Sequence, residues 1–140
     1  MPLAVRVIIL AALGLLLAVL VRLLRGYFAT SSLPRLFDPR DLDIDQTRGA
    51  GPLLVEFTSP YCYECQAALP MLEAASRAHT APLAVVDAKT RPDLAGKYAI
   101  RYTPTILVVD RGGAVRAGWL GTPTEAELEA ALTACNGKPR

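Results

Sequence analysis

The feature that most constrains the fold is the stretch 53–65, where an apolar run rich in strand-forming residues ends in a short turn and a Cys-x-x-Cys pair. Leu53–Phe57 is expected to be a buried strand, and the pair opens a helix. This spacing places Cys62 at the helix N-terminus and Cys65 one turn further in, close enough to close a small ring. Because unpaired N–H groups and the helix dipole favour negative charge there, we expect Cys62 to be the more acidic, attacking thiol and Cys65 the resolving one.

Three kinds of chemistry fit a Cys-x-x-Cys pair: a zinc site, a structural disulfide and a redox centre. Zinc would require a second pair or a Cys/His group with ligand spacing, and the chain offers only Cys135 and His79 besides the pair. Inside a βαβ pattern the motif favours redox chemistry. The chain has three cysteines, an odd number that argues against a dense disulfide scaffold and leaves the role of Cys135 open.

The composition fits one domain of ordinary size in a chain of 140 residues. The net charge is only +2, and no basic stripe interleaved with aromatic residues is present. The sequence therefore lacks the electrostatic footprint of a nucleic-acid-binding protein, and we expect no nucleic-acid partner.

An apolar segment near the N-terminus predicts a transmembrane helix. Residues 7–21 are all apolar or glycine and are bounded by Arg6 and Arg22. That stretch reaches only about 22 Å, but residues 3–24 reach about 33 Å, enough for the hydrocarbon core, with both arginines able to extend to the headgroups. The alternative is a cleaved signal peptide with a weak small-residue site at 29–31. Because arginines intervene before that site, we expect an uncleaved single-pass anchor.

The basic residues around the span bear on its orientation. The N-terminal side carries Arg6 and the amino terminus, whereas the other side carries Arg22, Arg25, Arg35 and Arg40. Taken alone, this count places the C-terminal domain in the cytoplasm.

After the anchor, the pattern predicts alternating strands and helices. The elements expected are an edge strand at 33–37, a helix from Pro39 capped by Asp38 and stopped by 49–52, the strand 53–57, a helix from Cys62 to about Arg77 containing Pro70, a strand at 83–86, a helix at 90–98, a strand at 105–109, a turn at 110–113, its antiparallel partner at 114–120, and a helix to about Ala134. The last helix is expected to start with a capping box at Thr122–Glu125. The order βαβαβαββα predicts an α/β fold, a mixed sheet with helices on both faces.

This order of elements, the Cys-x-x-Cys pair at a strand-to-helix turn, and the stretch Ile100–Thr105 together resemble the thioredoxin family over roughly residues 33–135. The resemblance is specific in combination, because further motifs also match: Val55–Phe57 before the pair, Pro70 after it, Lys97–Arg101 before Thr103-Pro104-Thr105, and Gly121 before the last helix. The fold class we expect is therefore a thioredoxin-like mixed sheet preceded by one N-terminal transmembrane helix.

The resemblance implies roles for individual residues. Cys62 matches the attacking thiol, Cys65 the resolving thiol, and Pro104 a cis proline that packs against the disulfide. Glu56 falls where the family usually has a buried aspartate that exchanges a proton with the resolving thiol, and burial would raise its pKa toward neutrality. The alternative for Glu56 is a salt-bridged residue of an edge strand.

Several positions depart from the family pattern. Tyr61-Cys62-Tyr63-Glu64-Cys65 replaces the usual Trp-Cys-Gly-Pro-Cys, and Val85 stands where a lysine often neighbours the buried acid. Glu64 adds negative charge that opposes a Cys62 thiolate, by under about 1 kcal/mol if exposed. Whether the pair works as a reductant or an oxidant stays open.

The function expected is a membrane-anchored thiol–disulfide oxidoreductase that exchanges disulfides with protein substrates and is served by an unidentified redox partner. Substrates are expected to contact Tyr61, Tyr63, Thr103 and Pro104, and neither a bound cofactor nor a resident metal is expected. Two alternatives are a protein that holds Cu(I) or zinc with the same cysteines, helped by Cys135 or a partner, and a redox-inactive interaction module.

The domain boundaries expected are an anchor at 1–25, a linker at 26–32, a thioredoxin-like domain at 33–136 and a polar tail at 137–140. Anchored members of the family often work outside the cytoplasm on cytochrome or envelope-protein thiols, which opposes the charge count. Because a folded domain can be translocated despite flanking charge, we expect this one to lie outside the cytoplasm.

Overall fold

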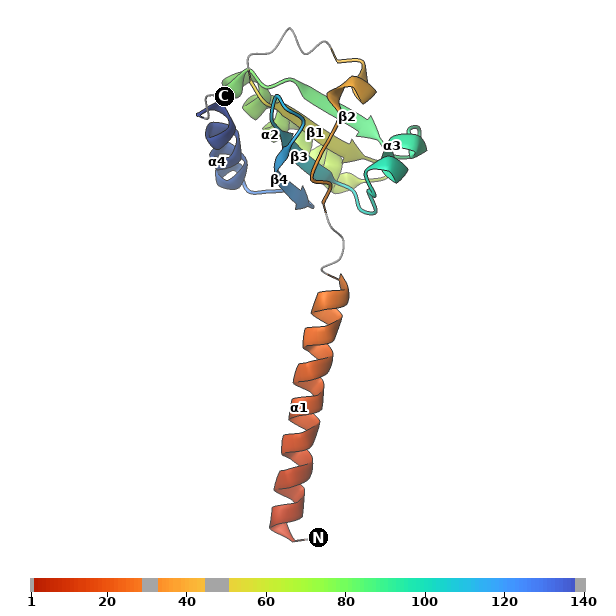
Figure 1. Cartoon of the computed structure of the whole chain (residues 1–140), viewed down its shortest axis with the longest axis vertical. Coiled ribbons are helices and arrows are strands. Elements are labelled where there is room, and N and C mark those ends of the chain that lie inside the picture. The colour runs from red at the N-terminus through yellow and green to blue at the C-terminus, as the bar shows by residue number, and fades with distance from the viewer. Residues whose placement is uncertain (1, 29–32, 45–50, 138–140) are drawn as a thin grey trace. The chain divides into compact units, whose positions relative to one another are not determined.

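The computed structural model describes residues 2–28, 33–44 and 51–137. The chain divides into two compact units, residues 1–32 and 33–140 (Figure 1). Each unit is considered by itself below.

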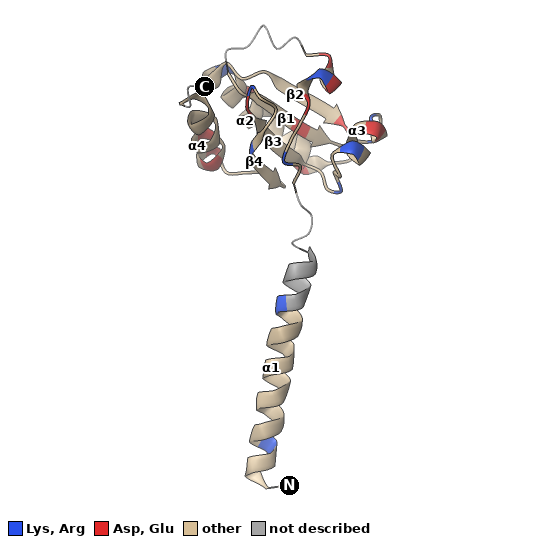
Figure 2. Cartoon of the chain, in the orientation of Figure 1, with Lys and Arg blue, Asp and Glu red and all other residues tan. Residues whose placement is uncertain are grey.

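The first unit contains the helix α1, Leu3–Phe28. Its residues Leu3–Arg22 have a mean hydropathy of 2.8 and none of that surface is buried, so the helix is long and apolar enough to cross a membrane. A signal sequence near an N-terminus has the same properties. Figure 2 shows that the coloured part of α1 carries only two charged positions, both basic, near its two ends. The helix continues to Phe28, past the residue at which we expected the linker to begin, and residues 29–32 lie outside the described part.

The second unit is built on a four-stranded sheet in the order β2-β1-β3-β4. The strands are β1 (Leu53–Thr58), β2 (Leu83–Asp87), β3 (Thr105–Val109) and β4 (Val115–Leu120). The pair β1 and β2 is parallel, whereas β1 with β3 and β3 with β4 are antiparallel. The sheet is therefore mixed, as the sequence predicts.

Helices cover both faces of this sheet. They are α2 (Tyr63–His79), α3 (Pro92–Lys97) and α4 (Glu125–Asn136), and a 3-10 turn at Pro39–Leu42 precedes β1. On one face, the sheet and the helices α2 and α4 enclose a buried apolar cluster, which consists of Leu54, Ala68, Leu72, Ala75, Ala81, Ile106, Val108, Leu128 and Leu132. On the other face, beneath α3 and the segment that carries Phe37, lies a second buried apolar cluster, which consists of Phe37, Leu53, Val55, Phe57, Ala84, Val86, Leu94, Tyr98, Leu107 and Val109.

The segment before β1 differs from the prediction. Instead of an edge strand at 33–37 there is a single bridge between Leu36 and Ala114. The helix expected from Pro39 is one 3-10 turn, which Asp43 ends in the left-handed conformation at φ 49°. The N-cap was predicted correctly, since the Asp38 side chain accepts the Arg40 N–H at 3.0 Å. Residues 45–50, where the rest of the expected helix would fall, lie outside the described part.

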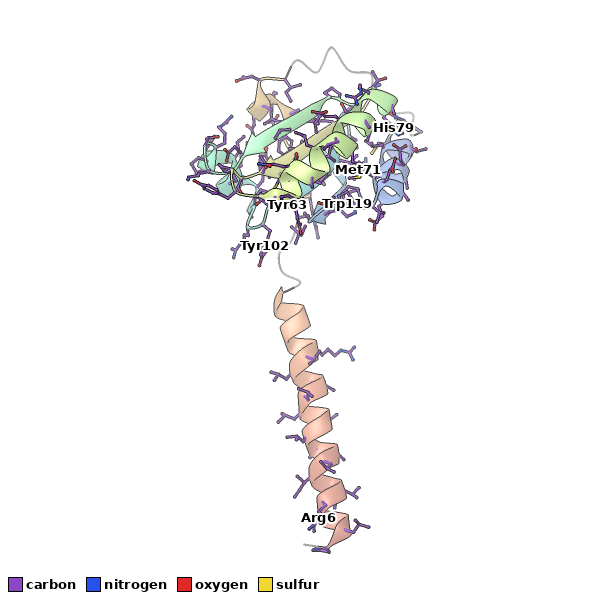
Figure 3. The ribbon with its side chains drawn as sticks, turned by 180° about the vertical axis from the view of Figure 1, so that it is seen from behind. Arg6, Tyr63, Met71, His79, Tyr102 and Trp119 are labelled. Carbon is purple, nitrogen blue, oxygen red and sulfur yellow. A yellow bond between two sulfur atoms is a disulfide. The ribbon has the colours of Figure 1, made fainter. Side chains whose placement is uncertain are left out.

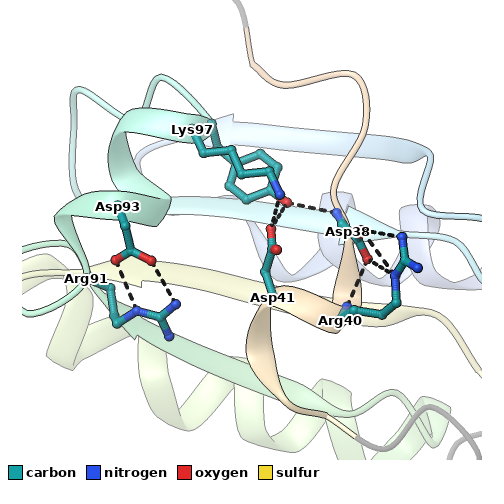
Figure 4. A network of polar contacts seen from close by, with 7 residues as sticks. Asp38, Arg40, Asp41, Arg91, Asp93 and Lys97 are labelled. Carbon is teal, nitrogen blue, oxygen red and sulfur yellow. Dashed lines mark hydrogen bonds and ion pairs between the residues drawn. The ribbon is translucent and has the colours of Figure 1, made fainter.

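This short segment is held by a polar network on α3 (Figure 4). The Tyr98 hydroxyl donates to Asp41, and the Asp38 N–H donates to the same hydroxyl at 2.9 Å. The Lys97 ammonium pairs with the Asp41 carboxylate at 2.7 Å. These hydrogen bonds from Lys97 and Tyr98 lower the pKa of Asp41. The network ties the 3-10 turn to the C-terminal end of α3, where the C-cap residue Tyr98 also stacks on Phe37 at 4.4 Å between ring centroids.

The cap of α4 is shifted by two residues from the prediction. The capping box is formed by Thr124 and Glu127 rather than by Thr122 and Glu125. The Thr124 side chain accepts the Glu127 N–H at 3.2 Å, and the Glu127 carboxylate accepts the Thr124 N–H at 2.8 Å. The sequence holds two overlapping Thr-x-x-Glu patterns, and Pro123 precedes the helix instead of opening it.

Candidate redox site

The two cysteines of the pair form a disulfide at the start of α2. The Cα atoms of Cys62 and Cys65 are 5.3 Å apart. Cys62 is the N-cap of α2, and its sulfur accepts the Cys65 N–H at 3.2 Å. Cys62 is half-buried, whereas Cys65 is only 2% exposed. Of the two cysteines, Cys62 is therefore the more accessible one.

A hydrogen bond connects the loop before the pair to the loop before β3. The Ser59 carbonyl accepts the Cys62 N–H at 3.1 Å, and the Ser59 hydroxyl lies 3.3 Å from the hydroxyl of Thr103. Ser59 thus contacts both the backbone of the N-cap cysteine and the side chain that precedes Pro104. Sequence reasoning did not identify Ser59, because its partner is far away in the chain.

The Thr103–Pro104 peptide bond is cis, as the family resemblance implied. Pro104 is buried, and its carbonyl accepts the Gly121 N–H at 2.7 Å. Gly121 has a φ of 110°, a backbone conformation that favours glycine. The Thr105 hydroxyl donates to the Tyr102 carbonyl at 2.7 Å, which closes the loop around the cis bond.

Glu56 is a buried carboxyl on the face of the sheet that α2 covers. Successive residues of a strand point to opposite faces, and Leu54, two residues earlier, packs under α2 and α4. The residues paired with Glu56 on the neighbouring strands are apolar: Val85 on β2 and Ile106 on β3.

Burial alters the chemistry of this carboxyl. Glu56 is 1% exposed, and its Oε1 has no hydrogen-bond partner among the residues that the structure describes. The loss of hydration raises the pKa of Glu56 to about 7. Because β1 is an interior strand, the alternative of a salt-bridged edge residue is wrong. Cys65 is the buried cysteine of α2, so both groups face the layer between α2 and the sheet.

Exposed tyrosines flank Cys62 in the chain and lie in the loop before Thr103. Tyr61 is 88% exposed and Tyr63 is 83% exposed, on either side of Cys62. Tyr102, in the loop before β3, is 54% exposed, and Figure 3 labels it together with Tyr63. We name Tyr61, Tyr63 and Tyr102 the tyrosine rim. Sequence reasoning selected the first two and missed Tyr102, although its place next to Thr103 was a usable signal.

The metal alternative needs ligands besides the cysteine pair. In residues 2–28, 33–44 and 51–137, no group of three or more His, Cys, Asp or Glu side chains is arranged to hold a metal. Cys135 packs against the cluster under α2 and α4. His79 contacts α4 instead, with its Nε2 2.6 Å from Glu129 and its Nδ1 3.2 Å from the Asn136 amide.

Comparisons with known proteins agree with this geometry. A family model described as Thioredoxin matches residues 41–134. A thioredoxin from Porphyra purpurea is 30% identical over 83 residues, which cover 58% of this chain and 77% of that protein. The protein disulfide isomerase-like 1-4 of Oryza sativa subsp. japonica is 45% identical over 60 residues, covering 39% of this chain but only 11% of that protein.

The solved structure of a mutant thioredoxin from Halobacterium salinarum superposes with a TM-score of 0.62. It is 21% identical, and the match covers 77% of this chain and 93% of that one. At this identity the likeness shows the fold, so the α/β fold expected from the sequence is confirmed.

Proposed function

The chain belongs to the thioredoxin family of thiol–disulfide oxidoreductases, and on this premise we propose that it is a membrane-anchored member that exchanges disulfides with protein substrates through Cys62 and Cys65. The observation that carries the proposal is the disulfide at the N-terminus of α2, with one half-buried and one buried cysteine. A helix N-terminus stabilises a thiolate, and partial exposure lets a partner reach it.

In the first step the reduced Cys62 thiolate attacks one sulfur of a substrate disulfide. A mixed disulfide forms, and the other substrate sulfur leaves as a thiolate that takes up a proton from water. The N-cap position favours this step, because the Cys65 N–H that points at the Cys62 sulfur also stabilises its negative charge.

In the second step Cys65 loses its proton and attacks the Cys62 sulfur. The second substrate thiolate leaves, so the substrate gains two electrons and the protein returns to the disulfide state. Glu56 is our candidate for the proton acceptor, since its carboxyl faces the same layer as Cys65 and its pKa of about 7 allows exchange near neutral pH. Run in reverse, the same steps oxidise a substrate, and a redox partner resets the pair in either direction.

Substrate contact is assigned to the tyrosine rim together with Thr103 and Pro104. The tyrosines offer exposed aromatic surface beside Cys62, and the Ser59 hydroxyl fixes the Thr103 side chain. Large amphipathic rings of this kind contribute much of the binding energy at protein interfaces.

The anchor proposal rests on the length and hydropathy of α1. We place the domain of residues 33–136 outside the cytoplasm. Two measurements test these points: the intact mass of the membrane-extracted protein distinguishes an uncleaved anchor from a processed signal sequence, and labelling of reduced Cys62 by a membrane-impermeant thiol reagent in intact cells reports the side.

The redox proposal is tested by following reduction of a peptide disulfide by the full chain in detergent. Parent protein should turn over with a thiol regenerant, and the Cys62→Ser variant should show no turnover. Equal rates for parent and variant would disprove the assignment of Cys62.

A further inference from the structure

A lysine cation lies over the ring of Tyr61, the residue before the attacking cysteine, and is used by no step described above. The Lys89 ammonium stands 5.4 Å from the centroid of the Tyr61 ring. Tyr61 directly precedes Cys62 and is almost fully exposed. An ammonium over an aromatic face is attracted by the ring quadrupole, which favours this position for the charge without neutralising it.

The backbone below Lys89 is fixed by several hydrogen bonds. The Ala88 N–H donates to the Thr58 carbonyl at 2.9 Å, which ties the turn after β2 to the end of β1. The Lys89 N–H donates to the Asp87 carboxylate at 2.8 Å, and the Arg91 N–H donates to the Asp87 carbonyl at 2.9 Å. These hydrogen bonds therefore hold the backbone of Lys89 in a defined position next to the end of β1.

Lys89 differs in its partners from the cations of the domain that form ion pairs. In the described ranges, carboxylates within salt-bridge distance are found for Arg40, Arg91, Lys97 and Arg116. The Lys89 ammonium has no such carboxylate there, and the Asp87 carboxylate contacts its backbone rather than its charge. An unneutralised positive charge is thus presented at the tyrosine rim.

We infer that Lys89 is a specificity-determining residue that favours substrates with a carboxylate next to the target cysteine. The inference rests on the proposed function and adds a substrate class to it. A substrate whose disulfide is within reach of Cys62 also has its neighbouring side chains near Lys89. For unit charges about 7 Å apart in a water-like dielectric, the attraction should favour a substrate with this carboxylate about threefold over a neutral one. Reversing the lysine charge should change kcat/KM for the carboxylate substrate about sevenfold.

The test compares three peptide disulfides that are identical except for Glu, Gln or Lys beside the target cysteine. The full chain in detergent is reduced, and kcat/KM is measured for the parent, Lys89→Gln and Lys89→Glu at low ionic strength. The parent should prefer the Glu peptide over the Lys peptide, Lys89→Gln should lose this preference, and Lys89→Glu should invert it. Raising the salt toward 1 M should remove the preference of the parent, because the Debye length falls to about 3 Å.

Lys97→Gln is the matched control. The Lys97 ammonium also stands 5.4 Å from a tyrosine ring, that of Tyr98, but Asp41 already neutralises it. This variant should keep the preference of the parent, and a ratio between peptides does not depend on how much of the variant is folded. Glu64 and Arg101 are also exposed, but they are the same in every variant, so their effect cancels when the preference of each variant is divided by that of the parent.

The outcomes separate the two proposals. If the parent reduces the three peptides equally, or if Lys89→Gln keeps the preference, Lys89 does not determine specificity and the proposed function is unaffected. If the parent reduces none of them, the proposed function fails and this inference fails with it.

Discussion

Replacing Glu56 with glutamine removes a buried ionisable group while keeping a side chain of nearly the same size. The carboxyl is 1% exposed, and burial raises its pKa to about 7 from the ordinary value of 4.5. In the native protein the carboxyl therefore holds its proton to a higher pH than in the unfolded chain. Protonated Glu56 is tolerated in this position, whereas the ionised form is destabilising.

The sign and size of the effect follow from this difference. Below pH 4.5 Glu56 is protonated in both states, so its ionisation does not lower the stability. Between pH 4.5 and 7 the unfolded chain loses this proton first, so the free energy of unfolding falls as the pH rises. Above pH 7 the loss is complete, at about 3 kcal/mol for the shift in pKa. The Glu56→Gln variant lacks this fall, so its stability relative to the parent should increase by about 3 kcal/mol from pH 4 to 8.

Urea denaturation of the oxidised full chain in detergent, at pH values from 4 to 8, measures this difference. The fluorescence of Trp119 is a suitable probe, because it is the single tryptophan and packs against the core under α2 and α4. Glu64→Gln is the control, since that carboxylate is exposed on the first turn of α2 and should leave the pH dependence of the parent unchanged. Turnover is measured on the same proteins.

Two results would refute the reasoning. If the stabilities of Glu56→Gln and the parent stay parallel across this pH range, the carboxyl is not held neutral by burial. If the variant also turns over at the parent rate across neutral pH, Glu56 is not the proton acceptor of the second step, because the variant should release substrate more slowly.

Three further predictions concern the anchor and the contacts that hold the domain. A chain that begins at Gly26 should be soluble and folded, as judged by circular dichroism and cooperative unfolding; aggregation of this chain alone would contradict an independent domain. Thr124→Ala should lower stability by about 1 kcal/mol in urea denaturation because it removes the cap of α4, whereas Thr122→Ala should have little effect. Tyr98→Phe should cost about 1–2 kcal/mol, since Asp41 loses a donor and the Asp38 N–H loses its acceptor; an unchanged midpoint would show that water replaces both.

The strands and the redox pair could be predicted from the sequence because local patterns specify them. Thr105–Val109 was predicted with its observed ends, since it is a continuous apolar run with a turn after it. The position of Cys62 as an N-cap follows from a strand, a short turn and a helix in succession. The cis bond before Pro104 required the family resemblance, because no local pattern distinguishes it from a trans bond.

The remaining features depend on contacts between distant residues. The two Thr-x-x-Glu patterns before α4 are equivalent in sequence, and tertiary packing decides that Thr124 is the cap. Leu36 pairs with Ala114, which the local preference of 33–37 for an extended strand could not specify. The contact of Ser59 with Thr103 and that of Lys89 with Tyr61 arise because the ends of β1 and β2 and the start of β3 lie at the same edge of the sheet.

The most direct test of the account is mixed-disulfide trapping in cells that express the full chain. Cys65→Ser should accumulate reductant-sensitive complexes with substrate proteins, because Cys62 can attack but nothing resolves the product. Cys62→Ser should accumulate few or none, and Cys135→Ser should behave like the parent. Equal trapping by Cys62→Ser and Cys65→Ser, or trapping that is lost when Cys135 is replaced in the Cys65→Ser chain, would contradict the roles assigned to the pair.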